Sequence, residues 1–415
     1  MPERRQPLRL LLLLPFAPRL DATHGGGQAM AQLLVPLSAR HRLALLYFRA
    51  DDEEHLDPLL QERCEVTVEI RRPVGWTSAS ARWRRRARLA KGLLRGRPIW
   101  ASDWAVDEYG RRLGALAREW RPDLIQIEYQ IMAQYLPSLA AWPAPRVLTV
   151  HEPGVSAARD LVRSRRGHAR LLSVADLLAW RRFEASHLAE VQAVVTFTEG
   201  DRRVLLPIAG RTPIVRIPLG STTPERPLDP LGHSPPILLF VGNYHHEPNV
   251  DAALRLCEAI FPAIRQRYPE AVLKVVGAHP PLHLRQAARD GVFITGAVPS
   301  VTPYLEEATL VVVPLRLGGG MRVKVLEALG AGKAIVASPL AAAGLDLVDG
   351  REIIMAETDQ QYRDAIQSLI DNPARRVALA RNARTWACTN LGWDGAIAAY
   401  EGLYARLLRR PQSEV

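Results

Sequence analysis

Cysteine is scarce in this 415-residue sequence, and closely spaced metal ligands are missing as well. The three cysteines lie far apart, form no CxxC pair, and are Cys64, Cys257 and Cys388. A disulfide framework or a thiolate metal site needs cysteines at short, regular spacing, so we expect neither, and a reducing compartment fits. The run His245–Glu247 also lacks the spacing of metal ligands, so we expect no metal site.

Long apolar runs are absent too. No apolar stretch approaches the ~20 residues that a membrane-spanning helix needs. The N-terminal run Leu10–Leu14 follows Arg4 and Arg5, as in a signal peptide, but it ends at Pro15. We therefore interpret it as a buried first strand and expect a cytoplasmic protein.

The usual nucleotide-cofactor fingerprints are incomplete. The segment HGGGQAMAQLL (His24–Leu34) lacks the spacing of the dinucleotide motif, and no acidic residue ends the second strand. This pattern argues against a simple NAD enzyme. The segment GAGK (Gly330–Lys333) imitates a P-loop, but Ala334 replaces the required Ser or Thr and a helix precedes the motif.

The sequence does contain a regular alternation of short apolar runs with longer helical stretches. The length and the 48% of hydrophobic residues allow two cores. The first set of predicted strands is Leu8–Leu14, Leu43–Phe48, Glu65–Ile70, Leu124–Glu128, Val147–His151, Ala193–Phe197 and Ile214–Pro218. The second set is Ile237–Val241, Ala271–Val276, Val292–Thr295, Leu310–Val313, Ala334–Ala337 and Glu352–Met355. Helix candidates between strands include Gln28–Ser38, Tyr109–Trp120 and Leu171–Glu190. This pattern predicts an α/β fold of two doubly wound, Rossmann-like domains.

A proline-rich segment separates the two sets of strands. Residues Ser221–Pro236 hold five prolines and a glycine, which is the composition of a linker. We place the domains at 1–224 and 225–392, followed by a C-terminal helix within 393–415. Sheets of this kind bind ligands at the carboxyl ends of their strands, so we expect a cleft between the two domains.

The strongest chemical signal is the segment PLRLGGGMRVKVLEALGAGKAIVAS, Pro314–Ser338. It reads as a strand end, a glycine loop, a helix and a strand, and the loop glycines are Gly318, Gly319 and Gly320. Glycines let the backbone approach a ligand, and the N–H groups at the start of the helix form an anion site. Arg322 and Lys324 suit a diphosphate, and Glu327 could accept hydrogen bonds from two ribose hydroxyls. The alternative is a Lys324–Glu327 helix pair beside an ordinary glycine loop.

A histidine lies at the end of one predicted strand. The segment VLTVHEPG puts His151 and Glu152 at a carboxyl end, where the active-site groups of such sheets occur. The alternative role for a lone histidine at this position is to cap a loop.

Several ordered segments together resemble family four of the retaining glycosyltransferases. Pro314–Ser338 is similar to the GGGxRxKxxEAxxxGxxxV variant of that family's donor-binding signature. The segments LLFVGNYHHEPNVDAALRL, FPAIRQRYPEAVLKVVG and FITGAVPSVTPYLEEATLVVVPL resemble the family's second domain. In the first half LPFAPRLDATHGGG, PDLIQIEY, VLTVHEPG and AVVTFTEGDRRVL are similar more loosely. The resemblance implies the GT-B architecture, with two Rossmann-like domains facing across a cleft and the C-terminal helix packed back on the first.

The resemblance also implies an activity. The family transfers a sugar from a nucleotide-sugar donor to an acceptor, here a glycan or lipid-linked molecule, with retention of configuration and without a metal or cofactor. The alternatives are a nucleotide-sugar epimerase, which shares the architecture, and a non-catalytic GT-B protein that binds sugar nucleotides.

Residue roles follow from the same resemblance. It implies that Glu327 binds the donor ribose, that Arg322 and Lys324 bind the diphosphate, and that His151 lies near the transferred sugar. We therefore count His151, Arg322 and Lys324 as catalytic. The remaining predicted donor-binding residues are Gly25, Gly26, Gly27, Val298, Gly318, Gly319 and Gly320. The first three would form a loop that meets the phosphates from the first domain, and Val298 belongs to a loop whose backbone reads the base.

The sequence departs from the family pattern at two places. Gly319 stands where the motif's first glutamate should lie, eight residues before Glu327, and that glutamate contacts the donor sugar in the family. Asn243 and Asn249 stand where many members carry Arg and Lys for phosphate. Arg322 and Lys324 are the candidate replacements for these cations.

The excess of 54 Lys and Arg over 43 Asp and Glu gives a net charge of +11, and it is densest in the segment Trp76–Trp100. There Trp83, Ala87, Ala90 and Leu94 recur at helical spacing among arginines, which is typical of helices that lie on anionic membranes. A peripheral position on the inner face of the plasma membrane would follow. The alternatives are a solvated arginine surface, a mobile acceptor-site loop or a nucleic-acid patch. We expect no nucleic-acid partner, because no binding module is visible elsewhere.

Overall fold

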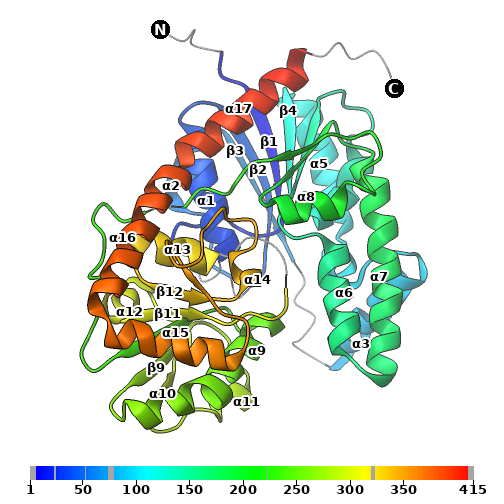
Figure 1. Ribbon diagram of the computed structural model, residues 1–415. Coiled ribbons are helices and arrows are strands. Elements are labelled where there is room, and N and C mark those ends of the chain that lie inside the picture. Colours follow the sequence, from blue (N-terminus) through cyan, green and yellow to red (C-terminus); the bar gives the residue numbers. More distant parts are fainter. Residues whose placement is uncertain are drawn as a thin grey trace.

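The computed structural model describes residues 6–22, 25–51, 53–72, 79–221, 223–318 and 323–409, and these form two α/β halves (Figure 1). Each half is built on one parallel sheet with helices on both faces, which confirms the predicted fold class. The described helices include none that is both long enough and apolar enough to cross a membrane.

The sheet of the N-terminal half has the strand order β3-β2-β1-β4-β5-β6-β7. Its strands are β1 (Arg9–Leu14), β2 (Arg42–Arg49), β3 (Val66–Arg71), β4 (Leu124–Glu128), β5 (Arg146–Val150), β6 (Ala193–Thr196) and β7 (Ile214–Arg216). The helices around it are α1 (Gly25–Ser38), α2 (Pro58–Arg63), α3 (Ala79–Leu94), α4 (Ile99–Asp103), α5 (Asp107–Trp120), the 3₁₀ helix η1 (Gln130–Leu139), α6 (Gly154–Ser164), α7 (Gly167–Leu188) and α8 (Glu199–Leu205).

The sheet of the C-terminal half has the order β10-β9-β8-β11-β12-β13. Its strands are β8 (Ile237–Val241), β9 (Val272–Val276), β10 (Val292–Ile294), β11 (Leu310–Val313), β12 (Ile335–Ala337) and β13 (Ile354–Met355). Its helices are α9 (Glu247–Arg255), the π-helical turn η2 (Leu256–Ile260), α10 (Phe261–Arg267), α11 (Leu282–Arg285), α12 (Thr302–Glu307), α13 (Val323–Ala331), α14 (Pro339–Ala342), α15 (Asp359–Asp371) and α16 (Pro373–Asn390).

The strands form where the sequence has apolar runs without polar alternation. In β1 every residue from Leu10 to Leu14 is buried, because α-helices cover both faces of the sheet. Each strand predicted from the sequence corresponds to one strand of the structure. The strand order reverses between β1 and β4 in one sheet and between β8 and β11 in the other, and ligands of such sheets bind at these reversal points.

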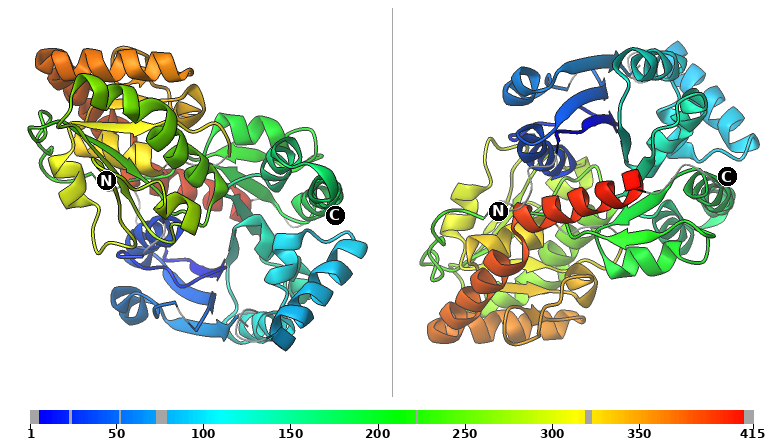
Figure 2. Two further views of the ribbon diagram at one scale, coloured as in Figure 1. Left: turned by 90° about the horizontal axis from the view of Figure 1, so that it is seen from below. Right: turned by 90° about the horizontal axis from the view of Figure 1, so that it is seen from above.

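The last helix, α17 (Trp393–Arg409), leaves α16 and packs on the N-terminal half (Figure 2). Ile397, Tyr400 and Tyr404 are buried in the core on one face of the N-terminal sheet. The Trp393 indole N–H donates to Gln32 Oε1 at 3.2 Å, which joins the start of α17 to α1. The two halves are therefore connected by two chain crossings, the segment around residue 221 and the start of α17.

The proline-rich segment is held against the C-terminal half by Lys333 and Arg384. Lys333, from the GAGK motif rejected above as a P-loop, is fully buried and donates to the backbone carbonyls of Asp229 and Glu306. Burial lowers the pKa of this lysine to about 8. Arg384 of α16 donates to the carbonyl of Pro224. The lysine therefore has a structural role in fixing the linker.

Two strand ends in the C-terminal half approach each other so closely that only glycine fits. Gly277 follows β9 with φ of 139°, and a Cβ atom built there would lie 1.8 Å from the carbonyl oxygen of Gly242, which follows β8. The clash is with backbone, which cannot rotate away as a side chain could. This contact sets the spacing of the strand ends that carry the Asn243–Asn249 segment.

We predict that Gly277→Ala lowers the free energy of unfolding by more than about 3 kcal/mol, because backbone must move to admit the methyl group. The matched control is Gly350→Ala, where φ is 77° but a Cβ atom would meet nothing within 4 Å. That control tests conformational strain alone and should cost about 1 kcal/mol. Denaturant unfolding followed by circular dichroism measures both, and equal losses would contradict the proposed clash.

Candidate functional site

Apart from Val298, the described site residues lie on segments that follow strands beside the two reversal points. In the N-terminal half α1 follows β1, and His151 follows β5, the neighbour of β4. In the C-terminal half the glycine loop follows β11, the neighbour of β8. The fold thus brings together segments that are about 300 residues apart in the sequence.

The N-termini of α1 and α13 meet between the two halves. A Cβ atom built on Gly25 would lie 3.3 Å from the side chain of Val323, the first residue of α13. The sequence predicted a loop at Gly25–Gly27, but these residues form the first turn of α1 instead. The absence of a side chain at Gly25 lets the two helix ends approach, and each helix directs the positive end of its dipole toward this point.

The glycine loop is described as far as Gly318. Gly318 has φ of 97°, and its N–H donates to Asp160 Oδ2 at 3.2 Å, across from α6 of the N-terminal half. The predicted residues Gly319, Gly320 and Arg322 lie outside the described residues.

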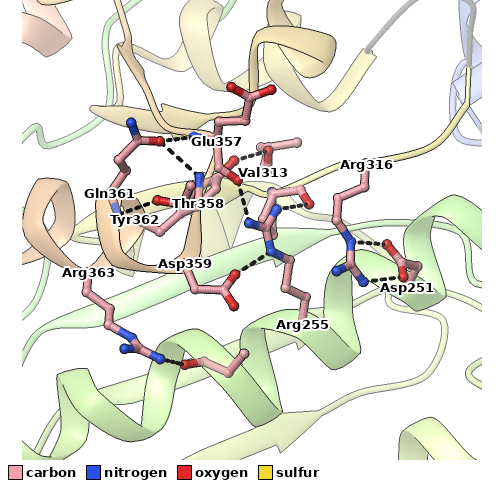
Figure 3. Close-up of polar contacts among 12 residues, drawn as sticks. Asp251, Arg255, Val313, Arg316, Glu357, Thr358, Asp359, Gln361, Tyr362 and Arg363 are labelled. Atoms are coloured by element: carbon pink, nitrogen blue, oxygen red, sulfur yellow. Dashed lines mark hydrogen bonds and ion pairs between the residues drawn. The ribbon is translucent and has the colours of Figure 1, made fainter.

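An arginine network anchors the start of the loop (Figure 3). Arg255 donates to Pro314 O at 3.2 Å, to Glu357 O at 2.6 Å and to Asp359 Oδ1 at 2.7 Å. Two residues further on, Arg316 makes a bidentate ion pair with Asp251 of α9, at 2.6 and 3.1 Å. These contacts join the loop to α9 and α15, so the backbone leading to Gly318 is fixed before any ligand binds.

Lys324 lies in the first turn of α13 and contacts the segment after β8. Its Nζ donates to Asn249 Oδ1 and lies 5.2 Å from the centre of the Phe240 ring. Asn249 in turn donates to the carbonyl of Asn243 at 2.7 Å. The cation of Lys324 therefore contacts Asn249 directly and is linked to Asn243 through it; these are the two asparagines that depart from the family pattern.

Glu327 lies one turn deeper in α13 and is partly buried. Burial raises the pKa of its carboxyl to about 7, and the nearby charge of Lys324 opposes this shift. Among the described residues no ion pair joins Lys324 to Glu327 and none donates a hydrogen bond to Glu327, so the structure does not form the simple helix pair considered above. A partly buried carboxylate without donors is suited to accept hydrogen bonds from a ligand's hydroxyls.

His151 is held by a buried carboxylate and by aromatic rings. Its Nε2 lies 2.8 Å from Glu128 Oε2, and its ring stacks on Tyr129 with centroids 3.7 Å apart and an angle of 9°. Phe197 contacts it edge-on at 4.8 Å. The tautomer with the proton on Nε2 would donate to this carboxylate and leave Nδ1 for another partner.

Glu128 belongs to a chain of polar side chains that reaches the last helix. Its Oε1 accepts from Thr149 Oγ1 at 3.1 Å and from the Gln126 amide, and Gln126 accepts from the Tyr404 hydroxyl. Gln126 and Glu128 are fully buried in β4, where unpaired polar groups are costly. The chain therefore fixes the orientation of His151 through α17.

Tyr129, next to Glu128, has φ of 67°, which is uncommon for a residue with a side chain. This turn places its ring between His151 and Trp100, whose ring centroid is 6.3 Å away at 82°. The ring of Phe16, after β1, contacts Tyr129 edge-on at 5.4 Å. The carboxyl ends of β1, β4 and β5 are therefore joined by one aromatic cluster.

A cavity of about 330 Å³ lies between α4, α6 and α7 and is lined by Glu152, the residue that follows His151. Apolar side chains such as Trp100, Leu161 and Trp180 line it, and Glu152 and Asp176 are among its polar groups. The start of α6 beside it is capped by the buried Glu184, which accepts from Gly154 N at 2.6 Å and Val155 N at 3.3 Å. Burial raises the pKa of Glu184 to about 7.

Val298 lies in the loop between β10 and α12 and packs against the C-terminal core. The side chain of Thr295 orders the start of this loop by accepting from Gly277 N and donating to Gly296 O. Across the described ranges no group of three or more His, Cys, Asp and Glu side chains could hold a metal ion.

Three residues of the site were missed by the sequence analysis. Glu128 was predicted only as the last residue of a strand. A carboxylate at the end of a buried strand nevertheless indicates a functional residue, because ligands bind at the carboxyl ends of such strands. Asp160 and Tyr129 carry no such signal, because an acid within a helix and an aromatic residue after a strand are common.

Comparisons with known proteins agree with this geometry. Residues 235–372 match the family described as "Glycosyl transferases group 1". This match agrees with the resemblance found in the sequence at its coarser level, that of group 1 glycosyltransferases. An uncharacterized glycosyltransferase from Methanocaldococcus jannaschii is 27% identical over 123 residues, which cover 29% of this chain and 31% of the relative. The match therefore spans about a third of that relative's length.

Two solved structures share the fold over nearly the whole chain. Sucrose-phosphate synthase from Thermosynechococcus elongatus has a TM-score of 0.69 at 17% identity and covers 96% of this chain and 99% of its own. HepE from Anabaena, solved with UDP and glucose, has a TM-score of 0.66 at 13% identity, with 96% and 99% covered. The fold is therefore GT-B, as predicted.

We predict that Glu327→Gln raises the melting temperature at neutral and alkaline pH. In the folded protein the Glu327 carboxyl keeps its proton up to about pH 7, whereas its ordinary pKa is 4.5. The stability of the folded state is therefore unaffected by this group below pH 4.5, falls as the pH rises from there, and has lost the full contribution above pH 7. One unit of pKa corresponds to about 1.4 kcal/mol, so the difference between 4.5 and about 7 predicts a gain of about 3 kcal/mol for the variant above pH 7.

The gain should shrink as the pH falls toward 4.5, where the wild-type carboxyl is protonated in both states. Differential scanning calorimetry across this range measures it, with the exposed Glu270→Gln as control. A gain that did not depend on pH would contradict the buried state of Glu327.

Proposed function

We propose that this protein is a retaining glycosyltransferase of family four that transfers a sugar from a nucleotide-sugar donor to a glycan or lipid-linked acceptor. The observation that carries the proposal is the meeting of the α1 and α13 N-termini, with Glu327 one turn behind them. Two helix N-termini that converge on one point suit a diphosphate, and a carboxylate one turn deeper suits the ribose.

Several contacts support donor binding at this point. The Gly318 amide already donates to a carboxylate, Asp160, which is an anionic acceptor as a phosphate is. Lys324 lies in the first turn of α13, and the resemblance to the family assigns Arg322 the same role of binding the diphosphate. HepE, which shares the fold, was solved with UDP and glucose, and this supports a nucleotide-sugar donor here.

The mechanism rests on electrostatic stabilisation of the leaving group. As the bond between the sugar and the diphosphate breaks, negative charge grows on the diphosphate, and the helix N-termini, Lys324 and Arg322 stabilise it. A β-phosphate oxygen takes the proton of the acceptor hydroxyl, which then attacks the sugar from the face that the diphosphate leaves. His151, fixed by Glu128, positions the sugar, and the proposal needs no metal and no cofactor.

The test is a panel of UDP-, GDP- and ADP-linked sugars in a thermal-shift assay, because a ligand of the folded state raises the melting temperature. The donor found is then incubated with acceptors, and NMR of the product gives its anomeric configuration. No shift with any donor would contradict the proposal. Binding without transfer or hydrolysis would favour a sugar-nucleotide sensor, and a changed sugar without acceptor would favour an epimerase.

We predict that donor binding releases a proton near neutral pH. Ribose hydroxyls that donate to Glu327 favour its ionised form, so binding lowers its pKa from about 7 and affinity rises as the pH passes through this value. Calorimetric titration with the nucleotide sugar in two buffers of different ionisation enthalpy measures the proton directly.

Glu327→Gln should abolish this proton release and weaken binding by about tenfold or more, since a hydrogen bond to a charged group is lost. Unchanged proton release in the variant would place the ribose elsewhere.

We also predict that Glu128→Gln lowers kcat about 100-fold with little change in donor affinity, because His151 loses the acceptor that orients it. His151→Ala should lower kcat at least as much. The control is Glu352→Gln, another buried carboxyl, which accepts from Val348 N in the C-terminal half. Equal losses of kcat in Glu128→Gln and the control would show a general effect of removing a buried charge.

A further inference from the structure

Helix α7 exposes an apolar stripe that no described part of the chain covers. Its members recur at positions i, i+3 and i+7, and their exposed fractions are 69% for Leu171, 38% for Val174 and 57% for Leu178. Leu172 beside them is 47% exposed. An isolated exposed leucine needs no explanation, but a stripe of them on one helix face indicates a binding surface.

The neighbouring helix α3 has the same character. The positions predicted from the sequence to form its apolar stripe, Trp83, Ala87, Ala90 and Leu94, are all exposed, with fractions of 71% for Trp83 and 89% for Leu94. Figure 1 shows α3 and α7 together in the lobe at the side of the N-terminal half, and α3 contacts α7. Of the other predicted tryptophans, Trp76 lies outside the described residues, and Trp100 packs inward against Tyr129.

Arginines flank both stripes. They include Arg82, Arg84 and Arg86 on α3, and Arg166, Arg170, Arg181 and Arg182 at the start and along α7. All seven are exposed, and none forms an ion pair with a described residue. Neither α3 nor the segment from Leu161 to Ala175 contains an acidic residue. This α3–α7 surface, defined by the two stripes and these arginines, is therefore apolar and uniformly positive.

We propose that the α3–α7 surface docks on an anionic lipid bilayer. Leucine and tryptophan side chains would enter the interfacial region, while the arginines beside them contact anionic headgroups. A second copy of the chain fits less well, because a twofold contact through this surface would place the same arginines of both copies against each other. The positive charge of the surface therefore favours binding to an anionic bilayer over self-association.

The docked surface borders the cavity between α4, α6 and α7, where the proposed function would place the acceptor. Leu172, beside the exposed stripe, also lines this cavity, together with Leu161 and Trp180. An acceptor anchored in the bilayer could reach the cavity past the side chain of Leu172. This consequence rests on the proposed function, whereas docking itself does not.

The experiment is co-sedimentation of the full chain with vesicles of phosphatidylcholine that contain one third phosphatidylglycerol, at about 0.01 M and about 0.15 M salt. We expect binding that weakens with salt and is lost on vesicles of pure phosphatidylcholine. Leu171→Ser/Val174→Ser/Leu178→Ser should reduce the partition coefficient about tenfold or more. Arg84→Ser/Arg86→Ser should reduce it about fivefold per residue at low salt.

Matched controls come from the C-terminal half. Leu282→Ser/Phe293→Ser/Val348→Ser removes three comparably exposed apolar side chains, and Arg226→Ser/Arg381→Ser removes two exposed arginines without ion pairs to described residues. Both controls should sediment like wild type. The melting-temperature shift with donor, measured on each variant, shows separately whether folding and donor binding are intact.

Three results would overturn the proposal. The first is a stripe variant that sediments like wild type, and the second is an equal loss in the matched controls. The third is a wild-type chain that dimerises in light scattering and ignores vesicles, while the stripe variant is monomeric, since this would assign the surface to a second copy. Retention of the donor shift in such cases would leave the proposed function standing.

Discussion

The approach of two helix N-termini, α1 from one half and α13 from the other, is the contact on which the site depends. Gly25 and Val323 meet at a distance that a side chain at residue 25 would occupy. The positive ends of two helix dipoles face each other there, so an anion that lies between them would stabilise the arrangement. The glycines of α1 therefore allow the two halves to approach closely, rather than making a loop flexible.

Several other contacts keep the N-termini of α1 and α13 close together. The proline-rich segment is tied to the C-terminal half by Lys333 and Arg384, and α17 carries the chain back onto the N-terminal sheet. Asp160 reaches from α6 to the amide of Gly318. Tyr404 of α17 donates to Gln126, which belongs to the hydrogen-bond chain that ends at His151. The helix that crosses between the halves therefore also helps to orient the histidine.

Three buried or partly buried carboxylates show how the same chemical group serves different purposes. Glu128 accepts from Gln126, Thr149 and His151, so its burial is compensated by donors on every side. Glu184 accepts two helix amides, yet its pKa still rises to about 7. Glu327 has the same raised pKa, but no described residue donates a hydrogen bond to it. A ligand that donates hydrogen bonds to this carboxylate would offset the free-energy cost of burying its charge.

The sequence by itself determined the strands, the α/β class and the strand–glycine–helix segment around Gly318, because apolar runs and glycines act over a few residues. It also placed His151 and Glu327 at the ends of secondary-structure elements. It did not determine the helical state of Gly25–Gly27, the pairing of Glu128 with His151, or the bond between Asp160 and Gly318, which are 158 residues apart. Such contacts depend on how the two sheets and the crossing helix pack against each other. A local pattern of residues does not encode the distance between segments that are so far apart in the sequence.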